Sequence, residues 1–443
     1  MAYLSSGHSL ANARMALKSC GETQKGFLSN FKTFFSPLIL KTLTVTSRCP
    51  PMPLNKERAK QVMERAGVDA ILAASPANVF YISDYYSAGT QLGCGTQGYA
   101  LLPLDAEPAL MAPLAEADLV AESRSWIKDV HWYGCLKVNV SKNDNVSEIT
   151  QAIIEATKAK AEQTPCDSLV ITATNRGLAK KTIAVDSQGV NSTRWENIKR
   201  NLPDAKIVDG SHLLQEIRAV KTFEEIELIK KAVEVTEKSM EDVLEIAQPD
   251  IMELDMSKMY SYSVAEDGGY VVSDNFGFGE RSAYPNPIPT TLQLRKGDLI
   301  RMSLGASWEH YNGNVTRTAA MGKPSAEVEK RLKTVIDAQE AAFDACRPGS
   351  TFGDVYAASQ RELEKGGVKE CSMSLGHCIG AEVNERPWVC PGDKTKIEEG
   401  MVLNIDVPFL DLGWGGIEME DAVVVTKKGL RLLTNTERTI YLL

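Results

Sequence analysis

The amino-acid sequence predicts a two-domain chain, with an α/β first domain and a second domain that combines long helices with a strand-rich end. The chain has 443 residues, of which 43% are hydrophobic and 24% charged, and this length is enough to bury more than one core. Strand and helix patterns alternate from Leu54 to about Val208, as in α/β domains. A strongly periodic helix over 223–246 follows, and strand-forming residues dominate 401–426.

The elements of the first domain follow from hydrophobic periodicity. Apolar residues spaced three and four apart predict a helix, whereas short apolar runs bounded by turn residues predict buried strands. This criterion predicts helices over 56–66 and 147–163. It predicts strands over 70–74, 99–102, 109–111 and 168–172.

The second domain is predicted to begin within 211–222, where the chain enters the long helix. Ile226, Ile229 and Val233 form one apolar face of that helix, and Glu224 and Glu225 are expected to stay in solvent. Two more helices are predicted over 326–345 and 354–364, the first of them stopped by Arg347-Pro348-Gly349. We therefore expect domains over 52–210 and 211–443.

Composition and charge narrow the classes of partner. The formal net charge is -9 and the isoelectric point is near 5.4, and no basic stripe interleaved with aromatic residues is present, so nucleic acid and anionic membranes are unsuitable partners. No apolar run reaches the roughly 18 residues that a membrane span needs. Nine cysteines without a CxxC pair favour a reducing compartment. We expect a small-molecule substrate.

Residues 1–51 differ in composition from the rest of the chain. They are rich in hydroxyl residues and hold one acidic residue, Glu22, against six basic ones. Such a segment is typical of an organelle transit peptide. The alternative is an upstream start that was wrongly assigned, since Met52 directly precedes the first domain. We expect a cytoplasmic protein, or a mitochondrial or plastid one if the leader is genuine. The six basic residues are Arg14, Lys18, Lys25, Lys32, Lys41 and Arg48.

Polar residues recur in five short segments of the second domain, at 301–305, 312–318, 376–380, 403–406 and 418–421. With these motifs and others in the same order, the chain from about Leu54 to its end resembles the pita-bread family that includes creatinase, aminopeptidase P, prolidase and methionine aminopeptidase. The other motifs are Arg218 and Lys221 with Glu225, Gly297-Asp298-Leu299, Arg347-Pro348-Gly349, Glu385-Arg386-Pro387 and Glu399-Gly400-Met401-Val402.

The resemblance implies a creatinase-like α/β N-terminal domain, an α+β pita-bread C-terminal domain with a curved antiparallel sheet, and a homodimer. In metal-dependent members, two aspartates, a histidine and two glutamates hold two metal ions. The matching positions here are Ser303, Asn314, His377, Asp406 and Glu420.

Several of these positions depart from the pattern of the peptidases. A serine and an amide cannot replace two metal-binding carboxylates, so a two-metal centre is disfavoured and we expect no metal cofactor. The alternative is a single divalent ion held by His377, Asp406 and Glu420. Two further histidines of the peptidases correspond to Asn286 and Asn384, and an arginine that often precedes the last glutamate corresponds to Glu418.

From these departures we predict a metal-independent, creatinase-like hydrolase that cleaves a C–N bond in a small polar, cationic metabolite. Alternatives are an Xaa-Pro-type metallopeptidase with a reduced metal site, a lyase on a betaine or sulfonium substrate, and a non-catalytic binding module. Cys378 as a thiol nucleophile is a further alternative. The expected catalytic residues are His377 as general acid/base with Glu385, Asp406 and Glu420, and the expected substrate-binding residues are Asn286, Ser303, Asn314, Asn384 and Glu418.

Overall fold

The computed structural model describes residues 54–92, 97–123, 125–141, 145–368 and 372–443. The leader predicted over 1–51 lies outside these residues. Within the described ranges, every helix is too short or too polar to span a bilayer. The domain boundary near residue 210 stays a prediction.

The first half of the described chain is built around one mixed sheet of seven strands in the order β5-β4-β3-β2-β1-β6-β7. Helix α3 (Lys56–Ala66) has the bounds predicted from the sequence, because Asn55 caps its first turn and Gly67 ends it in the left-handed conformation, with φ 64°. The strands are β1 (Ala70–Ala73), β2 (Tyr99–Pro103), β3 (Ala109–Pro113), β4 (Val130–Tyr133), β5 (Ala161–Glu162), β6 (Thr182–Val185) and β7 (Lys206–Asp209).

The strand predicted over 168–172 is wrong, because these residues lie in helix α8 (Pro165–Asn175). Thr164 and Asp167 form a capping box, with Pro165 in the first turn. A short apolar run does not distinguish a strand from a buried helix by itself.

The helix predicted over 147–163 is shorter than expected. The remaining helices of this half are α4 (Pro76–Ser83), α5 (Ala88–Gln91), α6 (Ala117–Ser123), α7 (Glu148–Lys158), α9 (Ser192–Asn201) and α10 (Ser211–Ala219).

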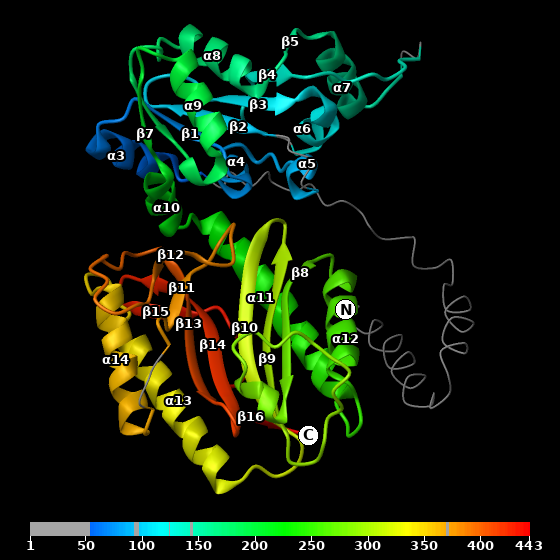
Figure 1. The fold of residues 1–443 in the computed structure, drawn as a ribbon, viewed down its shortest axis with the longest axis vertical. Helices are drawn as coiled ribbons and strands as arrows, with labels where there is room; N and C mark the ends of the chain where they lie inside the picture. Colours follow the sequence, from blue (N-terminus) through cyan, green and yellow to red (C-terminus); the bar gives the residue numbers. More distant parts are fainter. Residues whose placement is uncertain (1–53, 93–96, 124, 142–144, 369–371) are drawn as a thin grey trace, which may run out of the picture. The chain divides into compact units, whose positions relative to one another are not determined.

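The second half contains a largely antiparallel sheet with the path β12-β11-β13-β14-β10-β9-β8 (Figure 1). Two short strands extend it, β15 along β14 and β16 along β10. The strands are β8 (Tyr270–Phe278), β9 (Leu299–Trp308), β10 (Tyr311–Ala320), β11 (Gly376–Cys378), β12 (Glu385–Trp388), β13 (Val402–Asp411), β14 (Gly415–Thr426), β15 (Gly429–Leu432) and β16 (Ile440–Leu442).

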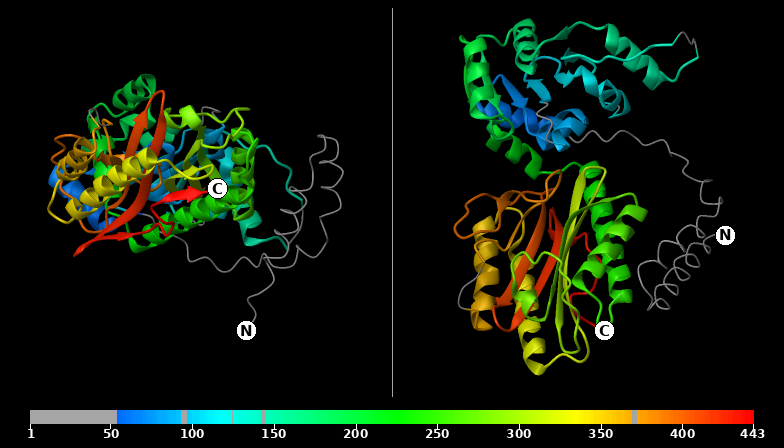
Figure 2. Two further views of the ribbon diagram at one scale, coloured as in Figure 1. Left: turned by 90° about the horizontal axis from the view of Figure 1, so that it is seen from below. Right: turned by 45° about the vertical axis from the view of Figure 1, so that its right-hand side comes forward.

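Four helices flank this sheet, as Figure 2 shows from two further directions. Helices α11 (Phe223–Ile246) and α13 (Ala326–Ala345) have the predicted bounds, and α14 (Phe352–Lys365) extends slightly beyond its prediction. The sequence did not predict α12 (Glu253–Glu266). One apolar core lies between α13, α14 and the β13–β14 pair, and a second lies between α11, α12 and strands β8 to β10. The predicted fold class is therefore confirmed.

Candidate active site

The central row of the site crosses four strands on one face of the sheet. Thr316 of β10 lies opposite both Ser303 of β9 and Glu420 of β14, and Glu420 in turn lies opposite Asp406 of β13. Directly opposite residues of neighbouring strands share a face of the sheet. The register therefore brings three of the predicted site residues together with one threonine.

A second row lies two residues further along the strands, on the same face because side chains alternate. Asn314 lies opposite Gly305, and His377 of β11 lies opposite Asn404 of β13. The Nδ2 of Asn404 donates a hydrogen bond to the carbonyl oxygen of Asn314 at 3.4 Å. This row places the predicted residues Asn314 and His377 beside the central one.

Glu420 is the residue that joins the two rows. Its Oε2 accepts a hydrogen bond from Thr316 at 2.7 Å, its Oε1 accepts one from Asn404 at 2.6 Å, and Oε1 lies 4.0 Å from Nε2 of His377. Burial raises the pKa of Glu420, while His377, Thr316 and Asn404 oppose that rise. Thr316 and Asn404 were not among the predicted site residues, although Asn404 precedes Asp406 by two positions and so shares its face.

The ring of His377 is oriented by the backbone. Its Nδ1 lies 2.9 Å from the carbonyl oxygen of Cys378. A carbonyl oxygen only accepts, so Nδ1 carries the proton of the neutral ring and Nε2 remains available as a base. Cys378 points to the opposite side, into the core with α13 and α14, and burial raises the pKa of its thiol to about 12. This geometry suits His377 as an acid/base and gives no support to a thiol nucleophile.

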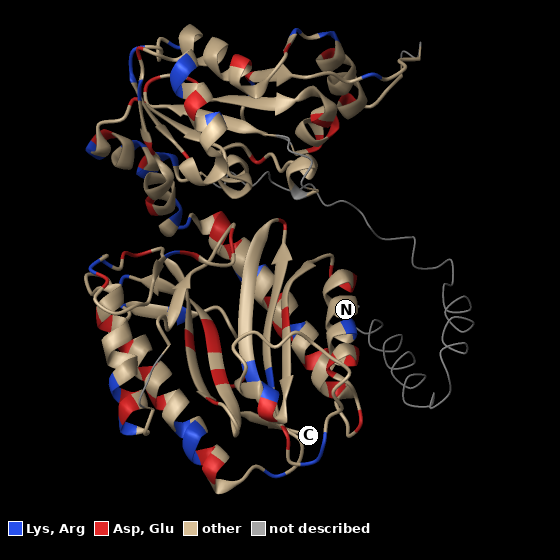
Figure 3. Ribbon diagram, viewed as in Figure 1, with Lys and Arg blue, Asp and Glu red and all other residues tan. Residues whose placement is uncertain are grey.

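A buried arginine neutralises Glu418. The guanidinium of Arg301 pairs with the Glu418 carboxylate, and both side chains are buried. Figure 3 shows acidic segments on β14 and basic segments on the neighbouring β9 and β10. Glu418 was predicted to bind the substrate, and in the structure its carboxylate is bound by Arg301. Arg301 precedes Ser303 by two positions, as Glu418 precedes Glu420, so strand alternation places each of them on the same face as its neighbouring site residue. Their pairing depends on the register between the strands.

Asp406 lies next to this pair. Burial raises the pKa of Asp406 well above its usual range, and the charges of Glu418 and Glu420 raise it further, while Arg301 opposes them. Asp406 also forms a side-chain hydrogen bond with Glu418. A carboxyl group whose pKa is raised in this way holds its proton to a higher pH than an exposed aspartate does and is able to act as an acid.

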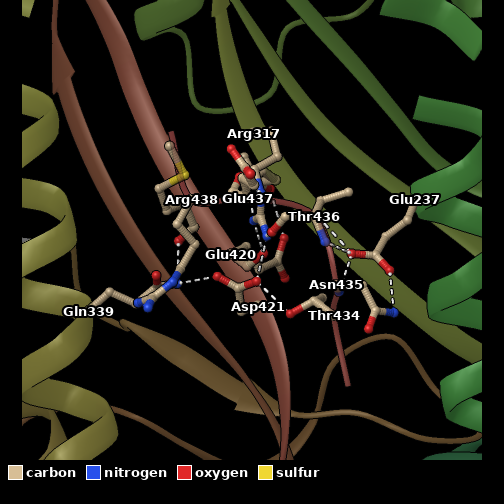
Figure 4. Close-up of polar contacts among 12 residues, drawn as sticks. Glu237, Arg317, Gln339, Glu420, Asp421, Thr434, Asn435, Thr436, Glu437 and Arg438 are labelled. Atoms are coloured by element: carbon tan, nitrogen blue, oxygen red, sulfur yellow. Dashed lines mark hydrogen bonds and ion pairs between the residues drawn. The ribbon is translucent and has the colours of Figure 1, made fainter. Parts of the chain in front are cut away.

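The opposite face of β10 and β14 carries a second buried network, shown in Figure 4. Arg317 donates hydrogen bonds to the carbonyl oxygens of Thr316 at 2.9 Å and Glu420 at 2.8 Å, and to the Asp421 carboxylate at 2.6 Å. Thr434 and Gln339 also bind Asp421. Arg317 therefore links the two backbones at the point where Thr316 and Glu420 form the central row.

Glu385 belongs to a different network from the one expected. Its carboxylate is buried and pairs with both Arg218 and Lys221, at 2.9 Å for the lysine. Burial alone would raise the pKa of Glu385, but these two cations lower it to about 2. Glu385 is therefore ionised throughout the neutral range, and this arrangement does not support its expected part in proton transfer.

Glu225 is buried beside that network, whereas the sequence predicted it in solvent. Burial raises its pKa to about 8, although the backbone N–H of Thr222 and the charge of Lys221 oppose the rise. A carboxyl group whose pKa is higher in the folded than in the unfolded state stabilises the fold when it is protonated. This stabilisation is complete below pH 4.5, the usual pKa of the group, and is lost as the pH rises through about 8.

Replacing Glu225 with glutamine should therefore flatten the fall in the free energy of unfolding between pH 6 and pH 8.5. The slope attributable to this one group is at most about 1.4 kcal/mol per pH unit. Urea unfolding of both proteins at several pH values measures the difference. Parallel curves for the two proteins would contradict the assigned pKa.

Asn286 and Asn384 lie in loops and are exposed. The loop of Asn286 reaches the site through its neighbours, because the carbonyl oxygens of Tyr284 and Pro285 accept hydrogen bonds from Arg301. Asn384 directly precedes Glu385. The structure thus brings together His377, Asp406, Glu418, Glu420, Ser303 and Asn314, and it leaves the two asparagines at the periphery.

The donor set does not fit a pair of divalent ions. Ser303 and Asn314 supply neutral oxygens where carboxylates are needed, and both oxygens of Glu420 already accept hydrogen bonds. Arg301 adds a permanent cation beside Asp406. In the described part of the chain, no group of three or more His, Cys, Asp or Glu side chains is arranged to hold a metal ion.

Comparison with known proteins finds relatives whose sequences match most of the chain. A Xaa-Pro dipeptidase from Pyrococcus furiosus is 27% identical over 389 residues, covering 87% of this chain and 98% of the relative. The putative dipeptidase YkvY from Bacillus subtilis is 26% identical over 390 residues, which cover 87% of this chain and 99% of the relative. Both matches extend through the two halves described above.

Solved structures share the fold. A Xaa-Pro dipeptidase from Bacillus anthracis superposes with a TM-score of 0.73 at 20% identity, covering 88% of this chain and 99% of that one. The prolidase from Pyrococcus furiosus superposes with a TM-score of 0.68 at 25% identity, and the match covers 85% of this chain and 99% of the prolidase.

Two family models match consecutive segments. The creatinase/prolidase N-terminal domain matches residues 56–220, and metallopeptidase family M24 matches residues 227–427. Together the two segments cover most of the chain, and the resemblance stated from the sequence is confirmed. The chain therefore carries a creatinase/prolidase N-terminal domain, followed by a domain that matches metallopeptidase family M24.

Proposed function

We propose that this chain is a metal-independent hydrolase that cleaves a C–N bond in a small polar, cationic metabolite. The observation that carries this proposal is the pairing of His377 with Glu420 in a site where Ser303 and Asn314 replace two carboxylates. A backbone carbonyl holds the proton on Nδ1, and Nε2 lies 4.0 Å from Glu420 Oε1. Because Arg301 neutralises Glu418 and Asp406 acts as a protonated acid, a cationic substrate balances Glu420.

The arrangement supports hydrolysis by proton transfer. His377 Nε2 accepts a proton from water, the water oxygen forms a bond to the substrate carbon, and the C–N bond breaks. The carboxyl group of Asp406 donates a proton to the leaving nitrogen, and the proton on His377 then returns to Asp406 through solvent. Glu420 stabilises the imidazolium that forms in the first step. Glu385 takes a structural part in this scheme, bound to its two cations.

The names of the relatives favour a second candidate, hydrolysis of Xaa-Pro dipeptides. That activity would use a metal ion, for which His377, Asp406 and Glu420 are the remaining ligands. The Arg301 cation beside Asp406 and the hydrogen bonds to Glu420 weigh against it. The expected homodimer stays a prediction under either candidate and is open to sedimentation analysis.

A thermal-shift screen of the full chain in the presence of a chelator tests the proposal. Guanidino acids, amidines, betaines and Xaa-Pro dipeptides form the panel, and release of ammonia or amine from each hit is then measured. A ligand at about 100 times its dissociation constant stabilises the fold by about 2.7 kcal/mol. We expect a cationic C–N compound to stabilise the protein and to be hydrolysed. Turnover of dipeptides alone, with added divalent ions required, would favour the second candidate.

A further inference from the structure

We propose that Arg218 is a positioning residue for His377, whose ring it holds in one orientation through Glu385 and strand β11. The inference rests on the proposed function for the role of His377 as an acid/base. It gives a part in the reaction to α10, a helix that lies outside both rows of the site. Asn78 completes the connection on the side of the first sheet.

A line of buried hydrogen bonds joins the first sheet to β12. Asp186, directly after β6, accepts a hydrogen bond from Asn78 Nδ2 at 2.8 Å. Arg218 Nη1 donates to Asn78 Oδ1 at 2.8 Å, and Arg218 Nη2 binds Glu385 at the start of β12. All four side chains are buried. The amide of Asn78 therefore bridges a carboxylate and a guanidinium, which needs a donor on one side and an acceptor on the other.

The carboxylate of Glu385 supports the turn between β11 and β12. Its Oε1 accepts a hydrogen bond from the backbone N–H of Glu382 at 3.2 Å. A Cβ atom on Gly380 would lie 2.8 Å from the same oxygen, so the carboxylate lies directly against this glycine. Lys221 Nζ donates to the other oxygen at 2.9 Å. Two cations that follow the first sheet and two backbone positions of the turn thus meet at one side chain.

Strand pairing extends this anchor to the ring of His377. Glu385 lies opposite Cys378 in the pairing of β12 with β11. The carbonyl oxygen of Cys378 is the group that binds His377 Nδ1, at 2.9 Å. A displacement of β12 would therefore move the acceptor that fixes the tautomer of the ring. Each link from Asn78 to His377 is a direct contact, and such continuous contacts carry coupling between distant groups.

Charge neutralisation alone does not account for Arg218. Lys221 already pairs with Glu385 as a second cation. Glu382 also pairs with Arg218, but its side chain is 49% exposed and keeps water as an alternative partner. What Arg218 adds is the bond to Asn78, since a guanidinium binds several acceptors in fixed directions whereas an ammonium is a point charge. This geometry favours a positioning role over a purely electrostatic one.

The tautomer of His377 tests the proposal without turnover. The chain has five histidines, so the ring ¹⁵N shifts of the labelled full chain give few signals, and His377→Ala identifies the one of His377. With the rings neutral, Arg218→Met should raise the ratio of the Nε2–H to the Nδ1–H tautomer about three- to tenfold, the effect of weakening one hydrogen bond.

Asn78→Leu is the second variant, because it cuts the connection while Arg218 and Glu385 stay paired. It should raise the tautomer ratio of His377 in the same direction. If Arg218→Met does not fold, the ratio in Asn78→Leu decides by itself. An unchanged ratio in the folded variants would overturn the proposal.

Arg176→Met is the matched control. Arg176 ends α8, its side chain is 12% exposed, and it binds Asp129 and the carbonyl oxygen of Glu107. These partners all lie in the first half, so the control should lose stability without changing the tautomer of His377. Equal changes of the ratio in Arg176→Met and Arg218→Met would assign the effect to a general loosening of the fold and contradict the positioning role.

Kinetics separate this inference from the proposed function. On the hydrolysed metabolite, Arg218→Met and Asn78→Leu should lower kcat about ten- to hundredfold and change KM less, because the ring is misplaced while the substrate contacts remain. A shifted tautomer in a chain that hydrolyses none of the screened metabolites would remove the proposed function and keep the positioning role. Hydrolysis at undiminished kcat with an unchanged tautomer would remove the positioning role and keep the hydrolase.

Discussion

Replacing Arg317 with methionine should lower the free energy of unfolding by about 3–5 kcal/mol, because it leaves a buried carboxylate without its cation. The Arg317 side chain is fully buried and its partner Asp421 is 1% exposed. The guanidinium also binds the carbonyl oxygens of Thr316 and Glu420. Methionine fills most of the volume but supplies none of these donors.

Urea unfolding followed by circular dichroism measures the loss. Arg65→Met is the matched control, since Arg65 pairs with Glu216 at the surface and its side chain is 63% exposed. The control should lose only about 0–1 kcal/mol, as exposed ion pairs do. Similar losses in the two variants would show that Arg317 does not hold β10 and β14 together as the geometry indicates.

Replacing His377 with alanine should lower kcat for the hydrolysed metabolite by about 10²- to 10⁴-fold, the usual contribution of a general acid/base. The melting temperature should change little, because His377 makes one backbone hydrogen bond and its side chain is 15% exposed. KM should change less than kcat, since the ring is expected to move a proton rather than to hold the substrate.

Cys378→Ala is the control for this variant. Cys378 adjoins His377 in the chain but faces the apolar core, so its replacement should preserve kcat while costing some stability. A His377→Ala protein with undiminished kcat would remove the acid/base assignment. Loss of kcat in Cys378→Ala without loss of stability would instead favour the thiol.

Much of the fold was predictable from local sequence. Helices α3, α11 and α13 begin and end where hydrophobic periodicity predicted, because this signal lies within each helix. The apolar run 168–172 was misassigned, since its helical state depends on a capping box and on packing rather than on the run itself. Glu225 was misplaced because the capping box ties its carboxylate to Thr222 in the interior.

The candidate site was predictable in part. Strand alternation shows which residues share a face with Ser303, with Glu420 and with Asp406 within their own strands, once the strands are known. Their cross-strand partners depend on register, which long-range pairing sets. That is why Arg301 as the counterion of Glu418 was missed. Glu385 was misjudged for the same reason, because its cations come from a distant segment of the chain.

Metal analysis of the purified full chain, combined with turnover in a chelator, tests most directly whether this protein works without divalent ions. We expect metal well below one ion per chain and hydrolysis of a guanidino or amidino substrate that the chelator does not reduce. Stoichiometric metal, with turnover lost in the chelator and restored by adding a divalent ion, would contradict the metal-independent site built on His377 and Glu420.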